Sequence, residues 1–264
     1  MLPYTTNGIE RELCRIKKII ASNQVDVETE IKRYSELCEE SADYLRKYCE
    51  YLLCYSSWAS IYLAVDEDVK SFKGYCYLAA RAGNICFRLF DKGFRTKSWV
   101  QTFVRNLETR EDIFFFAQYA ILANHNELAI QMASETSLLG SILIGNYEKA
   151  KTFLPQEIKE TRYTSYVNEI LWAIVYKDER RMNQYLEKRV KLMRREAKAG
   201  VPKYLDLFGL ALIKLAKARD MTCKLQVREL PQCLLDDIPV NEDEWHLPED
   251  YELDKMLAGM KQSR

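Results

Sequence analysis

Apolar side chains recur every three or four residues along most of the chain, which is the period of an amphipathic α-helix. The pattern from Ile31 to Ala59 indicates one long helix or a broken pair. Charged residues at Asp66 to Asp68 can start a second helix, whose expected end is Asp91-Lys92-Gly93 because glycine readily adopts a left-handed cap. The same pattern predicts shorter helices at about residues 96–108, 110–123, 126–144, 147–153, 156–176, 178–199 and 202–219.

Strand patterns are weak. Only Thr222 to Val227 alternates polar and apolar residues, and one such segment makes no sheet. We therefore predict an all-α fold, an irregular, repeat-like stack of about ten antiparallel helices in helical hairpins, with one short extended segment. Residues 1–235 are expected to form a single helical domain, and residues 236–264 an acidic C-terminal tail that could end in a short helix.

Composition narrows the functional classes. The 39 Lys and Arg residues balance 39 Asp and Glu, so general nucleic-acid binding, which depends on neutralising phosphates, is not expected. No apolar run is long enough to cross a membrane. The N-terminus lacks the apolar core of a secretion signal, so the eight cysteines are interpreted as free thiols and the location as cytoplasmic. Disulfide bridges are the less favoured alternative.

The residue patterns of known catalytic and metal sites are missing from the sequence. The histidines are His125, interpreted as a helix cap or surface residue, and His246 in the tail. No pair of Cys or His has the close spacing of a zinc site. No glycine-rich phosphate loop or nucleophile-elbow motif occurs either. We therefore expect no enzyme activity, no cofactor and no bound metal.

Charge is concentrated in two places. The first is a basic cluster on a predicted helix, which we interpret as a solvated face, with contact to an acidic partner or to the chain's own tail as the alternative. Its members are Lys188, Arg189, Lys191, Arg194, Arg195 and Lys198.

The second concentration is the tail itself, where residues 236–254 contain nine carboxylates and no Lys or Arg. A solvated tail is the plain interpretation. The alternative is a surface that captures a basic protein, because opposite charge speeds association and a tryptophan can supply the central contact. The candidate partner-binding residues are Asp236, Asp237, Asp243, Glu244, Trp245, Glu249 and Asp250.

Four segments of the C-terminal half carry a resemblance to a known family. In order along the chain they read GNYEKA, LWAIVYKDERRMNQYLEKRVKLMRRE, YLDLFGLALIKLAKARDM and VRELPQCLLD. Together they resemble the immunity protein 49 family of bacterial polymorphic toxin systems, best over residues 138–237. Family members often carry a glycine after the last long helix, where this chain has Asp220-Met221.

The resemblance implies an all-helical cytoplasmic protein that binds a cognate toxin domain stoichiometrically and neutralises it, with no catalytic residues to transfer. The alternative function is a helical-repeat scaffold or regulatory adaptor that binds a peptide or protein partner.

Overall fold

The computed structural model describes residues 68–91, 117–133, 137–154, 166–196 and 205–245, together with the isolated positions 11, 14, 15, 18, 49, 56 and 59. Eight helices have their bounds within these residues, residues 117–122 add a further helical stretch, and this part of the chain contains no strand. The all-α prediction is confirmed for this part, whereas the expected number of about ten helices is not confirmed.

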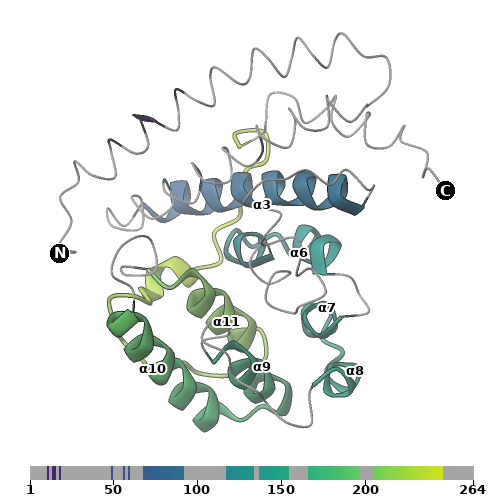
Figure 1. Cartoon of the computed structure of the whole chain (residues 1–264), viewed down its shortest axis with the longest axis vertical. Coiled ribbons are helices and arrows are strands. Elements are labelled where there is room, and N and C mark those ends of the chain that lie inside the picture. The colour runs from purple at the N-terminus through teal and green to yellow at the C-terminus, as the bar shows by residue number, and fades with distance from the viewer. Residues whose placement is uncertain are drawn as a thin grey trace.

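Helix α3 (Val69–Asp91) forms one layer of the described fold, and α6 packs against it (Figure 1). It begins where the sequence predicted, because the Asp68 carboxylate accepts a hydrogen bond from the Ser71 backbone N–H at 3.1 Å. Phe72, Cys76 and Ala79 recur at helical spacing and are fully buried, which places one face of α3 in the core. The expected cap Gly93 lies outside the described residues.

Three short helices follow, α6 (Asn126–Ala133), α7 (Leu138–Leu143) and α8 (Tyr147–Thr152). The prediction of one continuous helix over residues 126–144 is wrong. Ser137 has extended backbone angles and its side chain accepts a hydrogen bond from the Gly140 N–H at 3.0 Å, so a new helix begins after it. Because an internal serine cap resembles any other surface serine in the sequence, the hydrophobic period alone did not reveal the break.

The C-terminal part contains α9 (Val167–Tyr176), α10 (Glu179–Glu196), α11 (Leu207–Lys217) and the 3-10 helix η2 (Gln232–Leu235). Helix α9 packs against both α10 and α11. Helix α9 begins only after Tyr166, whose φ of 67° is left-handed, so the expected helix over residues 156–176 is not continuous through this position. The earlier part of that range, residues 156–165, lies outside the described residues.

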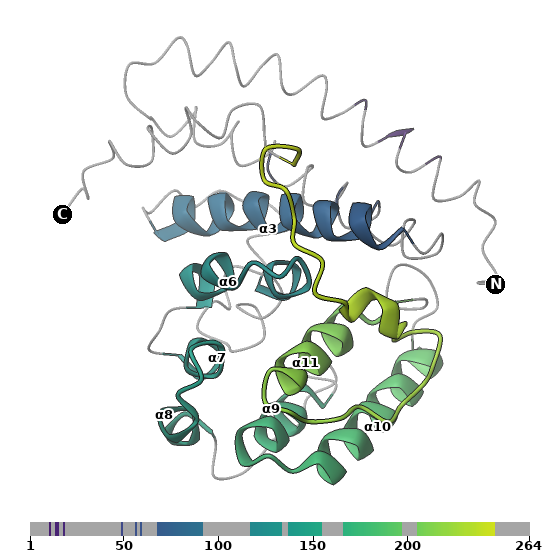
Figure 2. The same ribbon diagram turned by 180° about the vertical axis from the view of Figure 1, so that it is seen from behind.

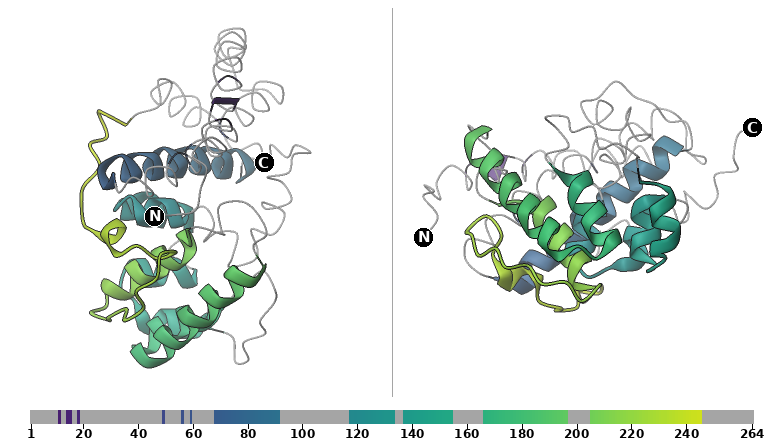
Figure 3. Two further views of the ribbon diagram at one scale, coloured as in Figure 1. Left: turned by 90° about the vertical axis from the view of Figure 1, so that its left-hand side faces the viewer. Right: turned by 90° about the horizontal axis from the view of Figure 1, so that it is seen from below.

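The chain beyond α11 returns along the surface of the helices. The segment predicted as extended, Thr222 to Val227, has no regular secondary structure and is not confirmed as a strand. Leu230, Leu234 and Leu235 are buried and fasten the following residues to the core. Residues 236–245 then cross α3, as the yellow segment of Figures 2 and 3 shows. The expected boundary between domain and tail at residue 235 stays a prediction.

Candidate functional site

Residues 236–245, here called the acidic strap, are fastened at their start by two polar side chains. Asn124, in a left-handed turn with φ 64°, donates its amide hydrogens to the backbone oxygens of Ile238 at 2.8 Å and Asp236 at 3.4 Å. The Lys214 ammonium donates to the Asp237 carboxylate at 2.7 Å. The hydrogen bond and charge of Lys214 hold the pKa of Asp237 below its ordinary value. The strap is therefore held by its backbone as well as by its charge.

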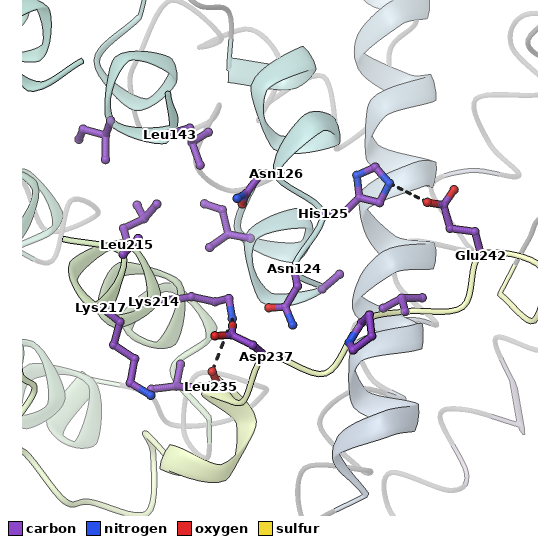
Figure 4. Close-up of a pocket in the computed structure, with 16 residues that line it drawn as sticks. Asn124, His125, Asn126, Leu143, Lys214, Leu215, Lys217, Leu235, Asp237 and Glu242 are labelled. Atoms are coloured by element: carbon purple, nitrogen blue, oxygen red, sulfur yellow. Dashed lines mark hydrogen bonds and ion pairs between the residues drawn. The ribbon is translucent and has the colours of Figure 1, made fainter. Parts of the chain in front are cut away.

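Glu242 is the central contact of the acidic strap. One carboxylate oxygen accepts the Tyr77 hydroxyl at 3.0 Å, and the other lies 3.2 Å from Nε2 of His125. Nδ1 of His125 accepts the Leu128 backbone N–H at 3.2 Å, so the ring proton is on Nε2 and points to Glu242. This contact confirms the prediction that His125 caps a helix. The same ring joins the start of α6 to the strap (Figure 4).

The end of the strap lies on α3 through an aromatic contact. Trp245 meets Tyr75 edge to face, with ring centroids 5.0 Å apart, and Lys70 pairs with Glu244 at 3.0 Å. Gly74 makes the approach feasible, because a Cβ at that position would come within 2.1 Å of the indole ring. This glycine is inside a helix, where alanine would ordinarily be more stable by about 1 kcal/mol. The close approach of Trp245 is the physical reason for a glycine here.

The strap presents negative charge to solvent while it is held. The side chains of Asp237, Glu242 and Glu244 are 90%, 61% and 50% exposed, despite their ion pairs. Exposed ion pairs of this kind contribute about 0–1 kcal/mol each. We infer that packing of Trp245 supplies much of the attachment and that the carboxylates remain accessible to a partner.

A pocket of about 550 Å³ lies between the strap, α11, α7 and the turn before α6. Its walls include the apolar side chains of Ile121, Ile142 and Leu215. Two polar pairs line it, the Lys214–Asp237 ion pair and the His125–Glu242 hydrogen bond, as the dashed lines of Figure 4 mark. Since these groups already bind one another across the pocket, the arrangement is suited to holding the strap in place.

One buried group near this site was missed at the sequence level. Lys73 is 1% exposed, and its ammonium donates to the Leu122 backbone oxygen at 2.7 Å. Burial, with a smaller contribution from the Lys214 charge, lowers the pKa of Lys73 to about 8. Because a lysine between Phe72 and Gly74 in an amphipathic helix usually reaches solvent, only the packing around it reveals its burial.

The candidate residues have different surroundings. Asp236, Asp237, Asp243 and Glu244 are exposed and Trp245 is partly buried. Glu249 and Asp250 lie outside the described residues. Apart from His125, which was predicted only as a helix cap or surface residue, the strap-holding residues on other elements were not identified from the sequence, because no motif links positions so far apart along the chain. They are Lys70, Gly74, Tyr75, Tyr77, Asn124 and Lys214.

The solvated-face interpretation of the basic cluster is wrong for Arg189, which is buried, whereas Arg194 is exposed but is also held by an ion pair. Arg189 makes two hydrogen bonds to Asp206, at 2.6 and 2.8 Å, and Arg194 makes two to Glu229, at 2.7 and 2.8 Å. Both acceptors precede the acidic strap, so these arginines join α10 to the rest of the helical body. Lys191 is exposed as expected, and Lys198 lies outside the described residues.

Among the residues that the structure describes, no group of three or more His, Cys, Asp or Glu side chains could hold a metal ion. None of the helices described has the length and apolar character needed to cross a membrane. The cysteines at 14, 49, 76, 86, 223 and 233 are free thiols.

Comparisons with protein-family models, with curated proteins and with solved structures gave no match to this chain. The resemblance to the immunity protein 49 family therefore stays a prediction.

Proposed function

We propose that this protein is an immunity protein that binds a cognate bacterial toxin domain and neutralises it by stoichiometric contact, without turnover. The acidic strap is the proposed contact surface, and it is suited to a toxin with a basic active-site cleft. Occupying such a cleft would exclude the toxin's substrate.

The observation that carries the proposal is the accessibility of the strap carboxylates. The carboxylates of Asp237, Glu242 and Glu244 stay half exposed or more while the strap is held across α3. Asp236 and Asp243 are also exposed. Charge held in a defined place costs less conformational entropy on binding than charge on a free tail, which favours tight association.

The proposal is tested by co-expressing the protein with the C-terminal domain of the protein that the upstream gene encodes, provided that this domain stops growth when it is expressed alone. Wild-type protein is expected to restore growth, whereas Asp236→Lys with Asp243→Lys is expected to lose protection and to weaken binding by roughly tenfold or more. A double charge reversal outside the strap, Glu148→Lys with Glu187→Lys, is the matched control, because both carboxylates are exposed and each pairs with a lysine on its own helix.

The outcomes separate the parts of the proposal. Failure of the wild-type protein to restore growth contradicts immunity against that toxin. Full protection by the doubly reversed variant, with unchanged salt dependence, shows that the strap is not the contact surface. Equal losses from the strap variant and from the control variant, Glu148→Lys with Glu187→Lys, would indicate an effect of net charge alone.

A further inference from the structure

The surface beneath the acidic strap is itself built like a binding site. We call it the strap groove and define it by Lys70, Gly74, Tyr75, Tyr77, Asn124 and Lys214. These residues come from three separate parts of the fold, α3, the turn before α6, and α11. Each of them contacts the strap through a side-chain group or, at Gly74, through the absence of one.

The groove offers a complementary group to each chemical feature of the strap. Lys214 and Lys70 meet the carboxylates of Asp237 and Glu244, and the Tyr77 hydroxyl meets that of Glu242. The Asn124 amide binds backbone oxygens, which are the same in any extended segment. The bare backbone at Gly74 receives the indole ring of Trp245.

None of these contacts depends on a covalent link between the groove and its occupant. The groove recognises three features of its occupant: the spacing of acidic residues, two accessible backbone oxygens and one aromatic ring. The chain's own segment is present at the high effective concentration of a tethered ligand, which is in the millimolar range for short flexible connections. An untethered segment of the same chemistry would therefore bind well only when the strap is displaced.

We propose that the strap groove is a binding site for an extended acidic segment that carries a tryptophan or similar aromatic residue, and that a partner protein supplies such a segment in competition with the strap. This function goes beyond neutralisation by the strap carboxylates and does not require a toxin partner. It corresponds to the alternative function named from the sequence, a scaffold or adaptor that binds a peptide or protein partner.

The test uses the full-length chain and a fluorescently labelled peptide with the sequence of residues 236–245, DDIPVNEDEW. In one variant the strap is released by Asp237→Lys, Glu244→Lys and Trp245→Ala. Fluorescence anisotropy is expected to show at least about tenfold tighter binding of the peptide to the released variant than to the wild type, because the tethered competitor has been weakened.

Adding Gly74→Ala to the released variant is the steric control. The new Cβ would occupy the place of the tryptophan ring, while alanine favours the helix, so peptide binding is expected to be lost without loss of helical circular dichroism. A peptide of scrambled sequence has the same charge and controls for general electrostatic attraction.

Three results would overturn the inference: equal peptide affinity for wild type and released variant, binding that survives Gly74→Ala, or equal binding of the scrambled peptide. If the triple substitution lowers helical circular dichroism, Trp245→Ala alone serves the same comparison. Growth protection is measured separately, so failure of the peptide experiment leaves the immunity proposal untouched.

Discussion

The buried pair of Arg189 and Asp206 supports a quantitative prediction about stability. Their side chains are 7% and 1% exposed, and two hydrogen bonds of 2.6 and 2.8 Å join them. Asp206 also caps α11, because Oδ1 accepts the Gly209 backbone N–H at 2.9 Å. One carboxylate therefore compensates a buried charge on α10 and an unsatisfied donor at the start of α11.

The two roles can be separated by substitution. Asp206→Asn retains an oxygen for the cap but leaves the Arg189 charge buried without its counter-ion, which costs about 3–5 kcal/mol. Asp206→Ala also removes the cap, at a further cost of about 1 kcal/mol. Arg189→Met with Asp206→Asn removes both charges and keeps the cap. This double variant is expected to lose only about 1 kcal/mol, because no buried charge remains.

Urea unfolding at neutral pH, followed by far-ultraviolet circular dichroism, measures these free energies of unfolding. Arg189→Met alone leaves the Asp206 carboxylate buried without its counter-ion and is expected to cost about 3–5 kcal/mol as well. The double variant is therefore expected to be about 2–4 kcal/mol more stable than Asp206→Asn, so the two single losses do not add. The reasoning is refuted if Asp206→Asn costs less than about 1 kcal/mol, or if the losses of the two single variants simply add in the double variant.

Three further predictions concern single residues. Burial acts to raise the pKa of Glu229, but hydrogen bonds from Arg194 and Arg228 lower it from 4.5 to about 2. The lowered pKa stabilises the fold above pH 4.5, so the advantage of wild type over Glu229→Gln, measured by urea unfolding, should fall by about 2–3 kcal/mol as the pH drops from 4.5 towards 2. The pKa of Lys73 is lowered from 10.5 to about 8 because burial disfavours the charged ammonium in the folded protein. The free energy of unfolding of wild type relative to Lys73→Met should therefore rise by about 2–3 kcal/mol between pH 8 and 10.5, in the same assay. Gly209→Ala places a Cβ 2.5 Å from the Asp206 carboxylate and 2.7 Å from the Leu230 side chain. The free energy of unfolding should therefore fall by about 1–3 kcal/mol and the melting temperature should fall with it, whereas a higher melting temperature would contradict the packing argument.

Local patterns in the sequence were sufficient for the helical character and for several helix ends. The start of α3 after Asp68 and the turns at Gly145 and Lys177 follow from short-range chemistry, because capping side chains and left-handed turns involve residues only a few positions apart. The same local information failed at Ser137 and Tyr166, where non-helical backbone angles start a new helix within an apparently continuous apolar pattern.

The candidate site was only partly accessible from the sequence. Its acidic composition and Trp245 were evident as a charge pattern. The contacts of Glu242 with Tyr77 and His125 were not, since they join residues 165 and 117 positions apart. No local period or motif relates such positions, and a single sequence contains no other record of their proximity.

By itself, then, the sequence predicted an all-α fold, and it showed a balanced net charge and an acidic, tryptophan-bearing segment near its end. Only the tertiary structure decided that Arg189 is buried against Asp206, that Lys73 is enclosed in the core, and that the acidic segment lies across α3 (Figure 2). The physical reason is that helix formation depends on neighbours in the sequence, whereas ion pairing, desolvation and the close contact at Gly74 depend on neighbours in space.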